Sequence, residues 1–220
     1  KIEVDENYIL ENIKKYKIPS SAASSKELVF EAYKDGLKRL LLPSLKREAL
    51  TLLKEKSSSE AITLFGKNLK ELLLTPPLVN QVILGMDPGY VSGCKLAVID
   101  ENGNYLASNV IYPTKPKEDF ITSAKIVLEL IKKYKINSIA IGNGTASQET
   151  AAFIVKLINE NNLDVKYAVV SEIGASVYSA SKIAMMEYPN LDVTIRGAIS
   201  IAQRLRDPMA ALVKIDPKSL

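Results

Sequence analysis

Asp87 stands where a carboxylate could do chemistry, between a short apolar run and a Pro-Gly pair. Residues 82–84 are apolar and partly β-branched, which favours a buried strand. Pro88 and Gly89 turn the chain immediately after the acid. We therefore expect Asp87 at the end of a strand, facing a cleft. A purely structural role, in which Asp87 forms an Asx turn, is the alternative.

The composition limits the chemistry that such an acid could perform. The chain has no histidine and one cysteine, Cys94, so a metal ion would have to be held by oxygen atoms. Carboxylate and carbonyl ligands favour Mg²⁺ or Mn²⁺ over zinc or copper. Because His-based acid–base catalysis is excluded as well, phosphate chemistry with a divalent ion is the catalytic option that remains.

The elements expected to position Asp87 are strands and helices in alternation. A second strand at 94–100, the turn-forming pair Asn102-Gly103 and a third strand at 105–111 predict an antiparallel meander. A helix at 117–134, a strand at 136–141, a helix at 146–161, a strand at 166–170 and helical segments at 176–187 and 196–213 follow. The first of these helices has an apolar face: Phe120, Ala124, Val127, Leu128 and Ile131.

The first third of the chain has the pattern of an all-α region. We expect helices at 7–16, 26–41, 44–55 and 58–73, separated by Pro43-Ser44 and by the serines at 57–59, which are good helix N-caps. Thr75-Pro76-Pro77 should close this region. The chain is therefore predicted to form two domains, at 1–77 and 78–220.

Charge and hydropathy exclude some classes of protein. With 220 residues, 47% of them hydrophobic, the chain can bury a core, and neither a membrane span nor a signal peptide is visible. We expect a cytoplasmic protein. The formal net charge of +4 is a weak argument for nucleic-acid binding. Because the sequence starts at Lys1 and has no obvious end, we expect a fragment of a longer protein.

Several motifs in order resemble the bacterial transcription accessory protein family Tex. They are residues 86–89 (MDPG), 142–147 (GNGTAS), 171–181 (SEIGASVYSAS) and 204–208 (RLRDP). Residues 38–44 and 72–78 also resemble this family, so the likeness covers roughly residues 30–220 and is weaker before Lys26. The resemblance implies an α/β fold, a ribonuclease H-like mixed sheet of YqgF type, preceded by an all-α helical region. It also implies a nucleic-acid partner, RNA or DNA, bound mainly through helix-hairpin-helix and S1 domains outside this sequence, and an association with the transcription machinery.

The resemblance to ribonuclease H-like nucleases implies candidate metal-binding and catalytic acids. These enzymes hold two divalent ions, here Mg²⁺ or Mn²⁺, with acids at a first strand end, after a later strand and on the last helix. Asp87, Glu172 and Asp207 match these places. Asn143 stands where many relatives carry another acid, so the match is partial. Glu172 could instead be a solvated loop residue, and Asp207 before Pro208 is a favourable N-cap.

A second set of residues is a candidate phosphate or nucleic-acid site. The glycine-rich loop at 142–145 precedes a helix, where Thr145 and Gln148 fit a capping box, and free backbone N–H groups there could cradle a phosphate. Arg196 and Arg204 are expected on one edge of an amphipathic helix. Tyr178 and Tyr188 could stack on bases, although tyrosines usually pack at core margins. The candidate phosphate-binding residues are Gly142, Asn143, Gly144, Thr145, Arg196 and Arg204.

Four functions are compatible with these patterns. The favoured one is a nucleic-acid-associated module of a Tex-like protein without strong catalysis. The alternative is a divalent-metal-dependent nuclease acting on RNA or branched DNA. A sugar-kinase or actin-like phosphotransferase shares the opening Asp-Pro-Gly and hairpin, but about 140 residues are too few for its two lobes. A rigid platform for other domains is the fourth.

Overall fold

A computed structural model of the chain describes residues 2–16 and 25–219. The chain divides into two compact units, Lys1–Asn68 and Leu69–Leu220. The expected domain boundary after residue 77 stays a prediction. Over the described residues, no helix is both long enough and apolar enough to cross a membrane.

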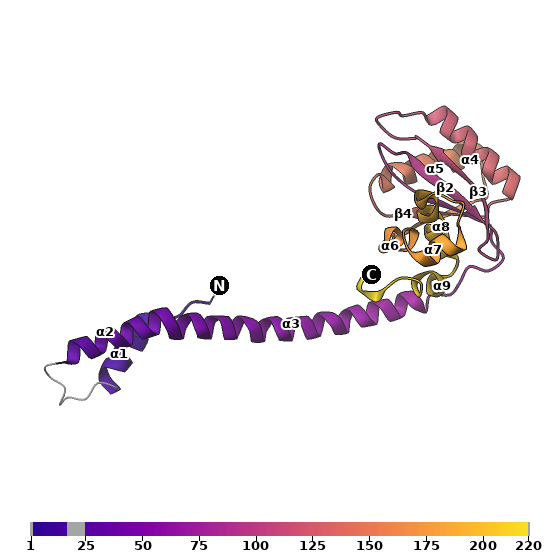
Figure 1. Cartoon of the computed structure of the whole chain (residues 1–220). Coiled ribbons are helices and arrows are strands. Elements are labelled where there is room, and N and C mark those ends of the chain that lie inside the picture. Colours follow the sequence, from indigo (N-terminus) through magenta and orange to yellow (C-terminus); the bar gives the residue numbers. More distant parts are fainter. Residues whose placement is uncertain (1, 17–24, 220) are drawn as a thin grey trace. The chain divides into compact units, whose positions relative to one another are not determined.

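The first part of the chain is helical, as expected. Helix α1 spans Glu6–Tyr16 and α2 spans Lys26–Gly36; a π-helical turn, η1 at Leu37–Leu41, leads into α3 at Leu42–Leu73 (Figure 1). The predicted breaks at Pro43-Ser44 and at 57–59 are wrong, because α3 runs through both. Proline is tolerated in a first helical turn. Serine inside a helix costs only about 0.5 kcal/mol relative to alanine, so three serines do not end a long helix.

A five-stranded mixed sheet forms the centre of the second unit. Its strands are β1 (Ile83–Asp87), β2 (Cys94–Ile99), β3 (Tyr105–Ile111), β4 (Ser138–Gly142) and β5 (Lys166–Val170). Their order is β3-β2-β1-β4-β5. Strands β1, β2 and β3 pair antiparallel, whereas β4 pairs parallel with both β1 and β5. With the helices that follow, this is the ribonuclease H-like arrangement, and the expected fold class is confirmed.

The predicted hairpin between β2 and β3 has a local chemical cause. Gly103 adopts a positive φ of 88°, which glycine tolerates without strain. The Asp100 carboxylate accepts hydrogen bonds from the backbone N–H groups of Asn102 and Asn104, at 2.9 and 2.7 Å. These contacts fix the turn after β2.

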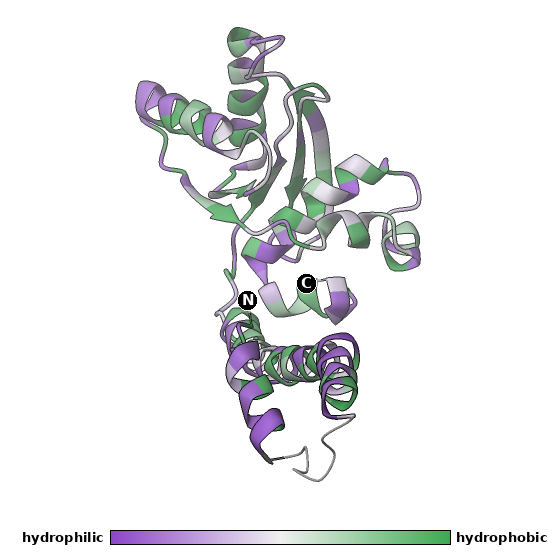
Figure 2. Cartoon of the chain, turned by 90° about the vertical axis from the view of Figure 1, so that its left-hand side faces the viewer, coloured by the Kyte–Doolittle hydropathy of each residue, from purple (hydrophilic) through white to green (hydrophobic). Residues whose placement is uncertain are grey.

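Helices cover both faces of the sheet (Figure 1). On one face lie α4 (Phe120–Tyr134) and α5 (Ser147–Asn161); α8 (Val193–Arg206) packs on the other, near α6 (Ala175–Ser179), α7 (Lys182–Glu187) and α9 (Pro208–Leu212). A short 3-10 helix, η2, spans Pro217–Ser219. In Figure 2 the central strands are largely hydrophobic, whereas α4 and α5 carry both kinds of residue.

Strand alternation explains the two cores. Leu84 and Met86 of β1 join the core under α4 and α5, and Ile83 joins the core under α8, because successive side chains of a strand point to opposite faces. All five apolar residues predicted for one face of α4 pack in the first of these cores.

Helix α8 lies so close to β1 that the strand needs a glycine at the crossing. A Cβ atom on Gly85 would come within 2.2 Å of the Ala198 carbonyl oxygen. Every residue of α8 from Arg196 to Arg204 is buried. The basic edge of this helix, with Arg196 and Arg204, is therefore buried and not exposed to solvent, because α8 is enclosed between the sheet and the shorter helices.

Three helix ends differ from the sequence-based expectation. The segment at 196–213 is interrupted at Asp207, which separates α8 from α9. The segment at 176–187 is likewise two helices, α6 and α7, and Ser181 caps the second by accepting a hydrogen bond from the Ala184 N–H. The capping box of Thr145 and Gln148 does not form, since Ala146 is the N-cap of α5 and adopts a left-handed conformation.

Candidate functional site

Asp87 is the last residue of β1, the central strand, as the sequence predicted. It pairs in register with Lys95 of β2, and Pro88 ends the strand after it. The backbone of β1 is held by neighbours on both sides, β2 and β4. The carboxylate therefore projects from a rigid part of the sheet, at the edge where β4 and β5 also end.

Glu172 lies in the loop between β5 and α6, and that loop is anchored at two points. The Glu172 backbone N–H donates to the Asn143 side-chain oxygen at 3.0 Å. The Arg204 guanidinium donates to the Ser171 carbonyl oxygen at 2.6 Å and also to the Ile173 carbonyl oxygen. Asn143 and Arg204 thus position the acid although neither contacts its carboxylate through a hydrogen bond.

Two glycines make room for the Glu172 side chain. A Cβ atom on Gly144 would lie 1.8 Å from one carboxylate oxygen of Glu172, and one on Gly142 would lie 2.6 Å from the other. The carboxylate therefore rests directly against the loop between β4 and α5.

Asp87 and Glu172 share a cavity of about 340 Å³. Helix α6 and the first turns of α8 form the rest of its wall, and Gly197 is the α8 residue nearest to the Asp87 carboxylate: a Cβ atom there would lie 3.1 Å from it. The remaining lining residues are small or hydroxyl-bearing, apart from Val193: Ala175, Ser176, Ser179 and Thr194.

The two acids repel each other in this cavity. The pKa of the Asp87 carboxyl is raised from 3.8 to about 6, mainly by burial and also by the negative charge of Glu172, while the positive charge of Lys95 lowers it. A raised pKa caused by burial and a like charge is typical of functional carboxylates, although structural networks also produce it.

Lys95 is a site residue that the sequence analysis missed. Its side chain is only 9% exposed, and its ammonium group donates to the Gly93 carbonyl oxygen at 3.0 Å and to the Ser92 hydroxyl. The signal in the sequence was a lysine inside an otherwise apolar strand, which is rarely buried without a partner. Its charge partly offsets the two carboxylates.

The third candidate acid, Asp207, lies elsewhere. It follows the last residue of α8, about 15 Å along the helix axis from Gly197, at the usual rise of 1.5 Å per residue. Its carboxylate accepts a hydrogen bond from the Ala210 N–H at 3.0 Å and caps α9, with Pro208 in the first turn. The structure thus brings Asp87 and Glu172 together and places Asp207 at the opposite end of α8.

The pair can be tested for its fit to a metal ion. Mg²⁺ is commonly held by one or two carboxylates together with water and substrate phosphates, so Asp87 and Glu172 fit one hydrated divalent ion. Within residues 2–16 and 25–219, no group of three or more His, Cys, Asp or Glu side chains is placed to hold a metal. Such an ion would therefore receive two carboxylates, those of Asp87 and Glu172, from the described residues.

Among the remaining phosphate-binding candidates, Gly144, Arg196 and Arg204 have roles within the fold. The space beside Gly144 holds the Glu172 carboxylate, which would repel a phosphate. Arg196 is 8% exposed and donates to the Tyr188 carbonyl oxygen at 3.1 Å. Arg204 is 5% exposed, and burial lowers the pKa of its guanidinium. Asn143 and Thr145 remain exposed at the surface of the loop.

The two tyrosines proposed as stacking residues differ in exposure. Tyr178 is 2% exposed and packs in a small core with Ala184, Leu212 and Ile215, so its ring is not available to a base. Tyr188 is partly exposed and packs beside the α8 core.

The fold and the acid pair define a class: a ribonuclease H-like domain with two carboxylates at the end of its central strand. Residues 81–206 match the family model of the Tex protein YqgF-like domain. The chain therefore belongs to the Tex family, as its motifs indicated.

Relatives from distant organisms support this assignment. The uncharacterized protein YdcI of Bacillus subtilis (strain 168) is 44% identical over 219 residues, which are 100% of this chain and 30% of that protein. The transcriptional accessory protein Tex of Neisseria gonorrhoeae is 49% identical over 180 residues, 80% of this chain and 23% of that protein. The S1 RNA-binding domain-containing protein 1 of Homo sapiens is 42% identical over 197 residues, 88% of this chain and 20% of that protein.

The chain thus spans less than a third of the length of these relatives. Among solved structures, Thermus thermophilus RuvC superposes with a TM-score of 0.42 and 16% sequence identity, covering 60% of this chain and 95% of RuvC.

Proposed function

We propose that the YqgF-like domain of this chain is a nucleic-acid-associated module that does not cleave nucleic acid efficiently. Its place in a Tex-type protein, whose relatives include a transcriptional accessory protein and a protein with an S1 RNA-binding domain in its name, supports the association with nucleic acid. The expected lack of efficient cleavage rests on the position of Asp207, which caps α9 and does not line the cavity of Asp87 and Glu172.

The site has too little negative charge to hold the two metal ions that efficient cleavage of nucleic acid requires. Two-ion nucleases neutralise the attacking and leaving oxygens with two divalent ions, which need several anionic ligands. Here Asn143 is uncharged, Gly197 faces Asp87 from α8 and Lys95 adds a positive charge nearby. These features lower the negative charge available to hold a second ion.

A second candidate function is a weak nuclease that uses one divalent ion. It is favoured by one observation, the raised pKa of Asp87 beside Glu172, since a bound Mg²⁺ or Mn²⁺ would relieve the repulsion between the acids. In that case Asp87 and Glu172 would hold the ion, and the ion would activate a water molecule for attack on a phosphodiester.

One set of measurements separates the two functions. Fluorescence anisotropy would measure binding of labelled single-stranded RNA and of a four-way DNA junction, both with 5′-hydroxyl ends, at several salt concentrations. Gel assays with Mg²⁺ and Mn²⁺ would measure cleavage, and calorimetry would measure metal binding. The variants are Asp87→Asn and, as a control at an exposed carboxylate, Asp164→Asn.

The proposal expects salt-dependent binding that Asp87→Asn does not weaken and cleavage no faster than in the control without protein. Metal-dependent cleavage by the wild type that Asp87→Asn abolishes and Asp164→Asn retains would establish the nuclease instead. If neither nucleic acid binds at low salt, the module is not associated with nucleic acid through this chain, and the platform role would replace both.

A further inference from the structure

A second cavity lies at the other end of the sheet from Asp87. Its volume is about 500 Å³. It is bounded by the β2–β3 hairpin, the ends of α7 and α8, and α9. Because Asp87 pairs with Lys95 at the start of β2, the hairpin after β2 stands a full strand length away. The cavity is therefore separate from the acid pair.

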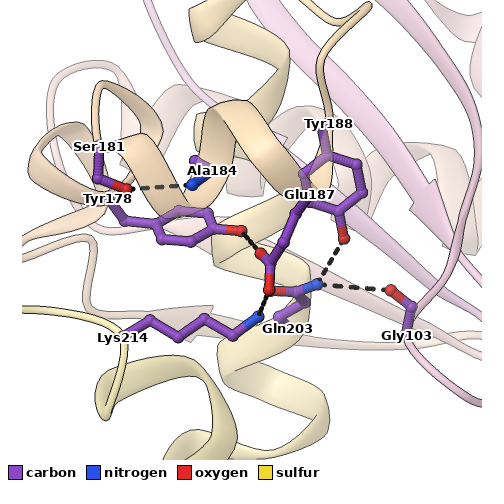
Figure 3. Close-up of polar contacts among 8 residues, drawn as sticks. All are labelled: Gly103, Tyr178, Ser181, Ala184, Glu187, Tyr188, Gln203 and Lys214. Atoms are coloured by element: carbon purple, nitrogen blue, oxygen red, sulfur yellow. Dashed lines mark hydrogen bonds and ion pairs between the residues drawn. The ribbon is translucent and has the colours of Figure 1, made fainter.

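The wall of this cavity is held in place by side-chain hydrogen bonds, drawn in Figure 3. The Gln203 amide donates to the Tyr188 hydroxyl at 2.9 Å and to the Gly103 carbonyl oxygen at 3.4 Å. The Lys214 ammonium forms an ion pair with the Glu187 carboxylate at 2.7 Å, and that carboxylate also accepts from the Tyr178 hydroxyl (Figure 3). These bonds join α7, α8 and the hairpin, so the cavity is preformed.

Arg206 is the group in this wall whose bonding is incomplete. Within the described part of the chain its side chain makes no hydrogen bond or ion pair, and its Nε atom is buried without a partner. The guanidinium lies against the hairpin: a Cβ atom on Gly103 would come within 2.9 Å of Nε and 3.1 Å of Cζ. Because Nε is buried, a ligand in the cavity would meet the terminal nitrogens of Arg206, and the donor fork of a guanidinium matches the oxygens of a carboxylate or a phosphate.

The charges around Arg206 favour a ligand with a single negative charge. The cavity is lined by two cations, Arg206 and Lys214, and two anions, Glu187 and Asp207. Lys214 is paired with Glu187, which leaves Arg206 as the cation open to a ligand. Within the described residues, Asp207 is the lining acid left without an ion pair, and its charge opposes a multiply charged phosphate more strongly than a monoanion.

The rest of the wall suits a nucleoside. Tyr105 and Tyr188 offer ring surface, on which a base can stack, and the amides of Asn102 and Asn104 offer polar groups at the mouth. A volume of about 500 Å³ lies within the usual range of about 300–1,000 Å³ for small-ligand sites.

We propose that this cavity binds one nucleotide unit of a single-stranded nucleic acid, with a backbone phosphodiester at Arg206 and its base beside Tyr188. The strand must be single because a stacked and paired base cannot enter the cavity. This inference rests on the proposed association with nucleic acid and assigns a binding site to it.

The test uses a ligand that carries one phosphodiester and no terminal phosphate, the dinucleoside monophosphate of adenosine. Its uncharged methylphosphonate analogue and inorganic phosphate are the comparison ligands. Calorimetry on the full chain would measure binding to the wild type, to Arg206→Gln and to Asn102→Asp, which adds a negative charge at an exposed position of the mouth. Lys182→Gln, at an exposed residue outside the cavity, is the control for loss of a charge.

We expect the dinucleotide to bind the wild type and the Lys182→Gln variant equally. Arg206→Gln and Asn102→Asp should each weaken binding about tenfold or more, as expected for one charge-assisted contact, and the methylphosphonate should bind the wild type about tenfold less tightly. Asn102→Asp tests the site even if Arg206→Gln does not fold.

Equal binding by all variants, equal binding of the uncharged analogue, or tighter binding of inorganic phosphate than of the dinucleotide would each overturn the assignment. So would no binding of the dinucleotide. Long strands that bind with unchanged affinity to Arg206→Gln would overturn this site alone and leave the proposed function intact. Dinucleotide binding at the cavity without binding of long strands would contradict the proposed function and support the site.

Discussion

Burial and the charge of Glu172 both disfavour the ionised form of the Asp87 carboxylate. Removing this charge should therefore stabilise the folded protein. The largest cause of its raised pKa is burial, followed by the charge of Glu172. Asp87→Asn keeps the shape of the side chain and removes the charge. We therefore expect the variant to be more stable than the wild type at neutral pH.

The magnitude follows from the pKa. A rise from 3.8 to about 6 in the folded protein corresponds to about 3 kcal/mol, at about 1.4 kcal/mol for each pH unit. The sign follows from linkage, because a folded-state pKa above the unfolded value means that the unfolded chain releases its proton first. The stability contributed by the protonated form is complete below pH 3.8 and is lost as pH rises to about 6.

The assay is urea unfolding of the wild type and Asp87→Asn between about pH 3.5 and pH 7. Near-ultraviolet circular dichroism would follow the tyrosines, most of which lie after residue 80. The difference in unfolding free energy should grow by about 3 kcal/mol over this range, with its midpoint between the two pKa values. The exposed Asp164→Asn should change stability by less than about 0.5 kcal/mol.

A difference between Asp87→Asn and the wild type that does not change with pH would refute the reasoning. So would a difference that grows as the pH falls, because that result would mean a lowered pKa for Asp87 in the folded protein.

Further substitutions test other parts of the same structure. Gly85→Ala should destabilise the domain by about 3 kcal/mol in urea unfolding, because its Cβ atom would meet the backbone of α8 at 2.2 Å. Asp207→Ala should lower stability by about 1 kcal/mol through loss of the α9 cap while leaving any metal affinity measured by calorimetry unchanged; a large loss of metal affinity would return this acid to the metal site. Gly144→Ala should displace the Glu172 carboxylate, because the new Cβ atom would lie 1.8 Å from one of its oxygens. The pH midpoint for Asp87, measured from unfolding curves, should then move towards 3.8.

Much of the domain was predictable from the sequence because its signals are local. The apolar run before Asp87, the Asn102-Gly103 turn and the alternation of later strands and helices each depend on neighbouring residues. They gave the order of elements and placed Asp87 at the end of β1. The helix break predicted at the serines was wrong because a propensity cost of about 0.5 kcal/mol per serine is overridden along a long helix. The break predicted at Pro43 was wrong because proline is tolerated in the first turn of α3.

The sequence by itself determined which residues can end strands, turn the chain and cap helices, and its motifs determined the family. Only the tertiary structure decided which acids meet. Asp87 and Glu172 come together because β1, β4 and β5 run parallel and end at one edge, whereas Asp207 lies at the far end of α8. Tertiary packing likewise enclosed Arg196 and Arg204 and left Arg206 beside a cavity, because burial depends on what packs against each face of a helix, which its own periodicity does not specify.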